Sequence, residues 1–283
     1  LNISVERLAE KLALARLAGR LPKVVIPVHF SGRSCDMRAI GQLAREYGFR
    51  VIEDASHAVG ASHEGVPVGA CQYSDVTVFS FHPVKIITTG EGGMLVTRNP
   101  EIAKRARIMR LHGINRDAFD RFTSKAPSWY YEIVAPGFKY NMTDIAASMG
   151  IHQLRKAHAF QQKRAYLASL YDEALKDLPL ILPPHAASGD VHSWHLYVLQ
   201  LGDGVKVSRD EVIERLFAKG IGCSVHYIPL HLHPYWRDTY HLTPEMFPAS
   251  QRIYERTLSL PLYSRMTEDD VLRVVAALRE SLA

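Results

Sequence analysis

Residues 23–55 decide the fold, because they contain KVVIPVHF at 23–30, DMRAIGQLAREYG at 36–48 and FRVIEDA at 49–55. The first and last segments are nearly continuous apolar runs, which are typical of strands buried on both faces of a sheet. Pro27 indicates an irregular or edge position in the first of them. The segment between them has the apolar spacing of a helix. A strand, a helix and a second strand in this order predict a parallel sheet covered by helices.

Predicted helices and strands continue on both sides of this stretch. Residues 4–18 have helical periodicity, with Ser4 as the N-cap and Gly19 just past the end. Thr143 is the expected N-cap of a long helix that connects two domains. The remaining predicted strands are 74–81, 92–98 and 193–201, and the remaining predicted helices are 100–113, 207–220 and 267–282. Residues 223–229 are a further part of the C-terminal α/β region.

The predicted domain organisation follows from these elements. A large domain occupies residues 1–142, a connecting helix region residues 143–178, and a smaller C-terminal α/β domain residues 179–283. Residues 115–140 have no clear periodicity, and their Arg, aromatic and Pro residues favour a long functional loop. The fold class expected from the whole pattern is α/β, with a mainly parallel sheet in the large domain.

Lys85 and Asp54 are the candidate catalytic residues. Lys85 lies in SFHPVKIITTGEGG (80–93), just after a predicted strand, and Asp54 ends the strand FRVIEDA. Ligands of parallel sheets gather at the carboxyl ends of strands, where burial lowers the pKa of a lysine and makes it a usable nucleophile. A pyridoxal phosphate (PLP) enzyme needs a lysine for the Schiff base and an acid for the pyridinium nitrogen. The alternatives are a solvated surface lysine and an aspartate that caps the next helix.

Several motifs together carry a family resemblance. They are EDASHAVGA at 53–61, VFSFHPVKIITTGEGGM at 78–94, HGI at 112–114, PGFKYNMTDIAA at 136–147, SWHLY at 193–197 and VHYIPLHLHPYWR at 225–237. In these motifs the chain resembles the DegT-type sugar aminotransferases, which are PLP enzymes of fold type I. Within that family, FHPVKIITT, WYYE at 129–132 and HYIPLHLHPY most resemble the aminotransferases of the pseudaminic acid pathway. Those enzymes aminate C4 of a UDP-linked 4-keto-6-deoxy-N-acetylhexosamine, with glutamate as the donor and 2-oxoglutarate as its product.

The resemblance implies further cofactor-binding residues. His57 lies where the family has Gln or His touching the cofactor ring or its O3′, and Ser80 matches the serine that donates to the phosphate. Lys139 and Asn141 fall where family members reach the phosphate of the neighbouring subunit's PLP, which implies a homodimer with shared active sites. Some relatives have Asn at position 139, so which of the two residues makes the contact stays open. Glu53 points to the opposite face of a regular strand, so Asp54 alone is preferred.

The resemblance also implies a substrate pocket in the C-terminal region. His226 and Tyr227 are the candidate substrate-binding residues, and Trp236 offers a further apolar face to a sugar or uracil. The three histidines of VHYIPLHLHPYW have a spacing that occurs in metal sites, but no carboxylate or cysteine completes a ligand set. We therefore expect no metal.

Composition excludes several other classes of protein. The net charge of +5 arises from 34 basic and 29 acidic residues without a basic run, which disfavours nucleic acid and fits a cleft for a phosphorylated cofactor and a nucleotide sugar. Cys35, Cys71 and Cys223 form no CxxC pair, which indicates a reducing cytoplasm. No apolar run approaches the ~18 residues of a membrane helix.

The predicted function is therefore PLP-dependent transfer of an amino group to a nucleotide-linked 4-keto sugar. The alternatives are an aminotransferase for an arabinose-type 4-keto or a 3-keto sugar, and a non-catalytic regulatory protein of the same fold. A sugar dehydratase of this fold is disfavoured, since those proteins replace the lysine with histidine. Family members also carry roughly 100 further N-terminal residues with a phosphate-binding turn. The sequence therefore predicts a fragment with an incomplete cofactor pocket.

Overall fold

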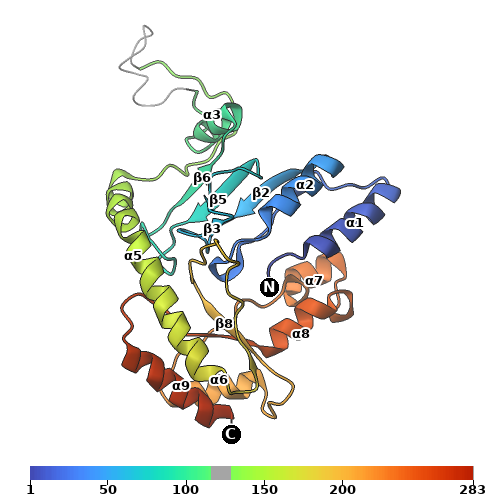
Figure 1. Ribbon diagram of the computed structural model, residues 1–283. Helices are drawn as coiled ribbons and strands as arrows, with labels where there is room; N and C mark the ends of the chain where they lie inside the picture. Colours follow the sequence, from blue (N-terminus) through green and yellow to red (C-terminus); the bar gives the residue numbers. More distant parts are fainter. Residues whose placement is uncertain (116–128, 283) are drawn as a thin grey trace. The chain divides into compact units, whose positions relative to one another are not determined.

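The computed structural model describes residues 1–115 and 129–282 (Figure 1). The chain divides into two compact units. The first unit comprises Leu1–Ala157 and Ser188–Val191, and the second comprises His158–Ala187 and His192–Ala283. The helix α5 (Asp144–Leu175) begins in the first unit and ends in the second.

The first unit contains a four-stranded sheet with the order β1-β2-β5-β6. Its strands are β1 (Val24–Val25), β2 (Arg50–Asp54), β5 (Val76–Ser80) and β6 (Gly93–Val96). β1 and β5 both pair in parallel with β2, whereas β6 is antiparallel to β5 (Figure 1). The carboxyl ends of β2 and β5 therefore meet at one edge of the sheet, as the sequence predicts.

Local signals in the sequence set the ends of the helices in the first unit. α1 (Val5–Leu17) begins at Ser4, whose side chain accepts a hydrogen bond from the Arg7 amide. α2 (Met37–Tyr47) begins at Asp36, which caps Ala39 in the same way, and ends on Gly48 in the left-handed conformation. α3 (Pro100–Met109) begins at Asn99 and ends four residues before the expected Gly113. Capping satisfies amides that have no partner within the helix.

The first predicted strand is much shorter and more exposed than the sequence indicates. Of residues 23–30 only Val24 and Val25 form a strand, and the side chains of Val24, Ile26 and Val28 are 43%, 57% and 41% exposed. The prediction of a buried strand is therefore wrong for this segment. β1 lies at the end of the sheet with a neighbour on one side only, and Pro27 has no amide hydrogen to extend the ladder.

The core of the first unit lies between the two N-terminal helices and the sheet. Leu12 of α1, Ile40 of α2 and Val51 of β2 are buried there with Met37 and Phe49. A short hairpin of β3 (Ser62–His63) and β4 (Val66–Pro67) lies between β2 and β5 in the sequence. Half of the predicted functional loop at 115–140 falls on residues 116–128, which lie outside the described residues.

The second unit is built on a three-stranded sheet, β7-β8-β9, with antiparallel pairing throughout. Its strands are β7 (Leu180–Ile181), β8 (Tyr197–Leu201) and β9 (Thr257–Leu260). α6 (Arg209–Ala218) and α9 (Glu268–Leu282) pack on this sheet through a core that includes Leu199, Leu216 and Leu258. Arg164 of α5 is buried in this unit and donates to the carbonyl oxygens of Trp194, His195 and Leu262.

Residues 223–256 contain elements that the sequence patterns did not predict. α7 (Pro234–Tyr240) and α8 (Pro248–Arg256) are short, and neither contains a buried residue. Residues 223–229 form only one isolated bridge to β9, between Ser224 and Ser259. Across residues 1–115 and 129–282, no helix is both long and apolar enough to cross a membrane.

Candidate functional site

Asp54 and Ser80 lie at the carboxyl ends of two neighbouring parallel strands. Asp54 is the last residue of β2 and is in register with Val78 of β5. Ser80 ends β5 two residues further on. The Asp54 carboxylate accepts a hydrogen bond from the Ser56 amide at 3.0 Å, and the Ser80 hydroxyl accepts one from the His82 amide at 3.4 Å. The edge of the sheet thus presents one carboxylate and one hydroxyl from adjacent strands.

Lys85 lies in the loop that connects β5 to β6, and hydrogen bonds close this loop on itself. The Phe81 amide donates to the Gly92 carbonyl at 2.8 Å, and the Thr89 amide donates to the Phe81 carbonyl at 3.0 Å. Ile86 and Ile87, directly after Lys85, are 5% and 3% exposed. These buried side chains anchor the loop next to the lysine. The GEGG sequence therefore forms part of a closed loop between β5 and β6.

The environment of Lys85 lowers the pKa of its amine. Burial disfavours the charged form and lowers the pKa, while the Asp54 carboxylate acts in the opposite direction and raises it. The net result is a pKa below the ordinary value of a lysine. Asp54 therefore acts electrostatically on Lys85, although the two residues are 31 positions apart in the sequence.

Glu53 and Asp54 point to different surroundings. Glu53 is 4% exposed and accepts hydrogen bonds from His29, Ser74 and Thr77. Burial by itself would raise the pKa of Glu53, but the hydrogen bonds from His29, Ser74 and Thr77 hold it below the ordinary value of a glutamate. Asp54 is partly exposed, and its carboxylate influences the pKa of Lys85. This arrangement supports Asp54 over Glu53 as the site carboxylate.

His57 is buried in the turn that follows β2. Its side chain is 5% exposed, and its Nδ1 accepts a hydrogen bond from the Ser31 amide at 3.3 Å. The ring of Phe30 lies 5.9 Å from the His57 ring, centroid to centroid. Residues 29–31 therefore pack against the turn that carries His57, a contact that no sequence pattern predicts.

Lys139 and Asn141 form a second group within the first unit. Lys139 Nζ donates to Asn141 Oδ1 at 2.5 Å, and both residues line a cavity of about 490 Å³ with Glu91, Gly92 and Met142. Asp54, His57, Ser80 and Lys85 do not line this cavity. The structure therefore separates the predicted cofactor-binding residues of the first unit into two groups.

A second cavity in the first unit, also about 490 Å³, is lined almost entirely by apolar side chains. Phe79 and Met94 of the sheet and Ile151 and Leu154 of α5 are among them.

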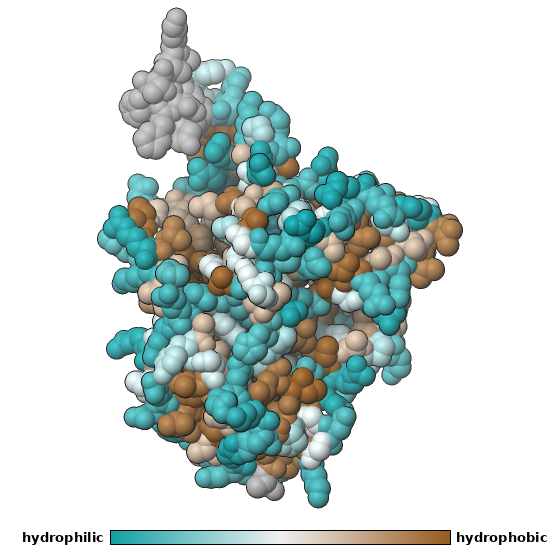
Figure 2. All heavy atoms as spheres, in the orientation of Figure 1, coloured by the Kyte–Doolittle hydropathy of each residue, from teal (hydrophilic) through white to brown (hydrophobic). Residues whose placement is uncertain are grey.

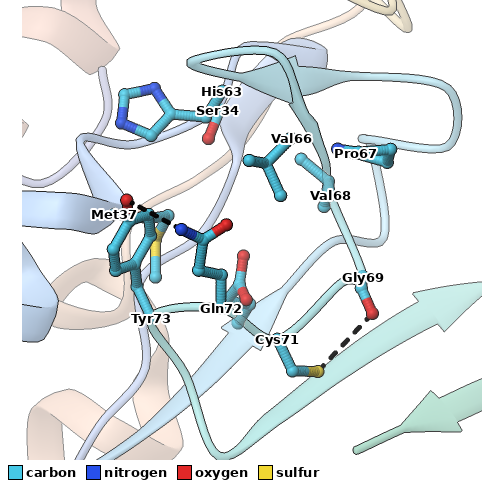
Figure 3. A pocket seen from close by; sticks show the side chains of 11 residues that line it. Ser34, Met37, His63, Val66, Pro67, Val68, Gly69, Cys71, Gln72 and Tyr73 are labelled. Atoms are coloured by element: carbon cyan, nitrogen blue, oxygen red, sulfur yellow. Dashed lines mark hydrogen bonds between the residues drawn. The ribbon is translucent and has the colours of Figure 1, made fainter.

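A third pocket is enclosed by the β3–β4 hairpin and the segment that follows it (Figure 3). Ser34, Met37, Cys71 and Tyr73 point into this pocket, whose volume of about 20 Å³ is close to that of a single water. It is too small for a sugar or a cofactor.

The predicted substrate-binding residues belong to the second unit. His226 Nδ1 lies 2.7 Å from the Ser259 hydroxyl, and the Tyr227 side chain is 56% exposed. Trp236 stacks on Tyr240 with ring centroids 5.8 Å apart. His231 is buried and contacts Gln251, whereas His233 contacts the Ile228 carbonyl. In the described part of the chain, no group of three or more His, Cys, Asp or Glu side chains is arranged to hold a metal ion.

The arrangement in the first unit is typical of one class of enzyme. A half-buried lysine follows one parallel strand, a carboxylate that acts on it ends the neighbouring strand, and a hydroxyl ends the strand that precedes the lysine. Structural comparison places the chain in the fold type I class of PLP-dependent transferases, which confirms the predicted fold class.

The chain belongs to the DegT/DnrJ/EryC1/StrS aminotransferase family, whose sequence model matches residues 1–279. This confirms the family resemblance that the motifs predict. Members of the family are PLP-dependent, and the similar solved structures include one in a PLP form.

Individual relatives are similar over nearly the whole chain. An uncharacterized protein of Methanocaldococcus jannaschii is 46% identical over 99% of this chain and 70% of its own length. The spore coat polysaccharide biosynthesis protein SpsC of Bacillus subtilis is 43% identical over 91% of this chain and 66% of its own length. Helicobacter pylori PseC, an aminotransferase involved in the biosynthesis of pseudoaminic acid, superposes with a TM-score of 0.86. It is 26% identical over 99% of this chain and 71% of the PseC chain.

Proposed function

We propose that this chain carries the PLP-dependent amino-transfer site of a nucleotide-sugar aminotransferase, with Lys85 as the nucleophile and proton carrier. The observation that carries the proposal is the lysine itself. Its pKa is lowered by burial, and it lies within the electrostatic influence of Asp54 at the carboxyl edge of the sheet. A structural lysine on a solvated surface would not have a lowered pKa.

The residues at this edge fit the chemical groups of PLP. Lys85 offers an amine with an increased neutral fraction, Asp54 a carboxylate for a protonated ring nitrogen, and Ser80 a hydroxyl for a phosphate oxygen. His57 offers a ring nitrogen from the turn after β2. When bound, PLP supplies the electron sink that stabilises negative charge at the carbon of the donor or of the sugar.

Lys85 performs two tasks in this proposal. As a neutral amine it would bond to the aldehyde carbon of PLP with loss of water, and the amino group of glutamate would displace it. The freed nitrogen would then take a proton from the α-carbon of glutamate and later deliver a proton to the sugar carbon. Both tasks require an amine that is partly unprotonated near neutral pH, which the lowered pKa of Lys85 favours. Asp54 would supply the negative charge that pairs with the protonated ring nitrogen in both half-reactions.

For the substrate, we assign a nucleotide-linked 4-keto sugar of the pseudaminic acid type, with glutamate as the donor. The similarity to PseC and to a spore coat polysaccharide protein supports this assignment. His226 and Tyr227 would contact the sugar, and the Tyr227 side chain is 56% exposed. Purified enzyme should be assayed with a panel of UDP- and dTDP-linked keto sugars. Turnover of arabinose-type 4-keto or 3-keto sugars in preference to the 4-keto-6-deoxy-N-acetylhexosamine would contradict the proposed substrate but not the proposed type of reaction.

We further propose a homodimer that works in a reducing cytoplasm. Lys139 and Asn141 line a cavity that excludes Lys85 and Asp54, which agrees with a role toward the neighbouring subunit's site. All three cysteines are unpaired, and burial raises the pKa of Cys35 to about 12 and that of Cys223 to about 11. Thiols of this kind react slowly and need no oxidising compartment.

Borohydride trapping tests the proposed role of Lys85 directly. Reduction of the protein with bound PLP should attach the cofactor covalently to Lys85, and peptide mass spectrometry should find the label there. Lys85→Ala should bind PLP only non-covalently and lose transamination, whereas Lys104→Ala on α3 should behave as the wild type. Attachment to a different lysine would refute the assignment. Absence of PLP binding altogether would contradict the proposed function.

A further inference from the structure

The side chains of Glu53 and His29 form a buried polar pair that the proposed mechanism does not use. His29 has no exposed surface, and its Nε2 lies 2.8 Å from Glu53 Oε2. His29 Nδ1 accepts a hydrogen bond from the Cys35 amide at 3.1 Å, so this nitrogen carries no proton. The His29 proton must then lie on Nε2, from which it is donated to Glu53. The protonation state of this histidine is therefore fixed by two partners.

The short 3₁₀ helix Phe30–Gly32 follows His29, whose side chain accepts a hydrogen bond from the Cys35 amide beyond this turn. The His29 amide donates to the Asp54 carbonyl at 3.0 Å, and the Gly32 amide donates to the His29 carbonyl at 3.2 Å. Ser31 within this turn has a φ of 57°, the left-handed region that a residue with a Cβ rarely adopts. Such a conformation persists where the surrounding contacts impose it. His29 supplies contacts on both sides of this residue.

The strained turn directs one backbone group at a proposed site residue. The Ser31 amide donates to His57 Nδ1 at 3.3 Å, and both residues are buried. A backbone amide can only donate, so His57 Nδ1 carries no proton. In the neutral imidazole the proton must then lie on Nε2, which makes that nitrogen a hydrogen-bond donor.

We propose that the Glu53–His29 pair is a positioning device that holds the Ser31 amide on His57 and thereby keeps His57 in its Nε2–H tautomer for the cofactor. The relevance to the cofactor rests on the proposed function, in which His57 contacts PLP. Glu53 and His29 touch no reacting atom and act through the turn 29–32.

A purely structural role explains the pair less well. A buried ion pair or charged hydrogen bond contributes little net stability compared with apolar residues of similar size, because desolvation offsets the attraction. In this sheet Glu53 accepts three hydrogen bonds, and the chain of contacts from it ends on the ring of His57. The network therefore connects the buried face of β2 to the turn that follows its carboxyl end.

Two substitutions of His29 separate its contacts. In His29→Gln the amide nitrogen takes the place of Nε2 and can still donate to Glu53. In His29→Asn the side-chain oxygen takes the place of Nδ1 and can still accept from Cys35, but the side chain is too short to reach Glu53. His63→Asn is the matched control, since His63 is a half-buried histidine of the same unit whose Nδ1 contacts Asp190.

The amide hydrogen exchange rate of Ser31, measured by NMR on the full chain without cofactor, reports whether the Ser31 amide is held on His57. Ser31 should exchange slowly in the wild type, and His29→Asn should accelerate its exchange on the order of tenfold, as loss of one buried hydrogen bond predicts. His29→Gln should retain most of the protection, and His63→Asn should retain all of it. Equal protection in His29→Asn and the wild type would overturn the proposal, as would equal acceleration in the control.

The wild-type protein supplies a test that needs no folded variant. Ring nitrogen shifts of labelled histidine should show an unprotonated Nδ1 in both His29 and His57. A proton on Nδ1 of either ring would overturn the assignment.

PLP titration, followed by absorbance, separates the two proposals. The dissociation constant of PLP should rise roughly tenfold in His29→Asn and stay unchanged in His63→Asn. If the wild type binds no PLP but the Ser31 exchange rates of the wild type and the variants are as expected, the proposed function is wrong. The role of the Glu53–His29 pair in holding the Ser31 amide is then still supported. If Ser31 exchange accelerates in His29→Asn while PLP affinity does not change, the positioning role for the cofactor is wrong.

Discussion

At the scale of single residues, adjacent carboxylates in β2 have different tasks because successive side chains of a strand point to opposite faces. Glu53 lies in the buried polar network with His29 and Thr77, whereas Asp54 influences Lys85. Their order in the sequence thus separates the buried acid of this network from the candidate catalytic one. The alternation was sufficient to prefer Asp54 from the sequence, but it did not identify the partners of Glu53.

The substitution Asp54→Asn should have two measurable effects. Without cofactor, the pKa of Lys85 should fall further, because the carboxylate that raises it is lost. In the enzyme with PLP, loss of the charge that holds the ring proton should lower the transamination rate on the order of a thousandfold. The pH dependence of Lys85 acylation measures the first effect, and single-turnover kinetics with glutamate measure the second.

Asp203→Asn is a suitable control for this substitution, since Asp203 is an exposed acid paired with Arg256 in the second unit. It should change neither quantity. A transamination rate of Asp54→Asn close to that of the wild type would show that Asp54 does not pair with the cofactor ring.

At the scale of elements, α5 and β8 of the second unit are joined through a partly buried acid. The Tyr197 hydroxyl donates to Asp172 Oδ1 at 2.7 Å, and His185 lies 3.0 Å from Asp172 Oδ2. Burial raises the pKa of Asp172, and the hydrogen bond from Tyr197 and the contact with His185 oppose this only in part. The folded state therefore retains the Asp172 proton to a higher pH than the unfolded chain does.

This pKa shift predicts a pH-dependent effect of Asp172→Asn on stability. As the pH rises from the ordinary aspartate pKa through the raised one, the wild type loses stability, since its unfolded state then binds fewer protons than its folded state. Asparagine keeps an acceptor for Tyr197 without the charge. At pH 7 the variant should be more stable by about 1 kcal/mol. Below the ordinary aspartate pKa this advantage should disappear.

Chemical denaturation of the wild type and of Asp172→Asn at pH 7 and at pH 3.5 measures this difference in the free energy of unfolding. Asp203→Asn again serves as the control and should show no comparable gain at pH 7. A destabilised Asp172→Asn at pH 7 would mean that the His185–Asp172 contact outweighs the cost of burying the charge.

At the scale of the whole molecule, the first unit exposes many large apolar side chains. On α5, Ile145, Ile151 and Leu154 are 81%, 55% and 63% exposed, and Trp129 and Tyr140 are 73% and 74% exposed. Figure 2 shows apolar side chains at the surface near the N-terminal end of α5. Large apolar side chains that gather at a surface can mark interaction sites in folded proteins. We expect a second copy of the chain to cover these side chains in the proposed homodimer.

Sedimentation measurements should therefore find a dimer of the chain at micromolar concentration. Ile145→Glu should shift the equilibrium toward monomer at least about tenfold, because a charge buried in an apolar interface is costly. Leu17→Glu, at a side chain that is 86% exposed at the end of α1, is the matched control and should leave the dimer unchanged. A monomer at all accessible concentrations, or equal dissociation in the control, would contradict the dimer or its location.

The sequence by itself determined the class of fold and most of the helices, and it singled out the candidate reactive residues. Helix ends such as Asp36 and Gly48 depend on hydrogen bonds within a few residues, so local composition predicts them. The strand–helix–strand order placed Asp54 and Lys85 near one edge of the sheet, because parallel strands end on the same side. The family motifs added His57 and Ser80 to that edge.

Only the tertiary structure decided which groups are buried and what each of them contacts. The apolar segment 23–30 is largely exposed because it lies at the end of the sheet, and apolar composition does not reveal whether a strand has a neighbour. The contacts from Glu53 through His29 and Ser31 to His57 join residues 24 and 26 positions apart. Such contacts depend on how distant segments pack, since a hydrogen bond needs a partner within about 3 Å in space, whatever the separation in sequence.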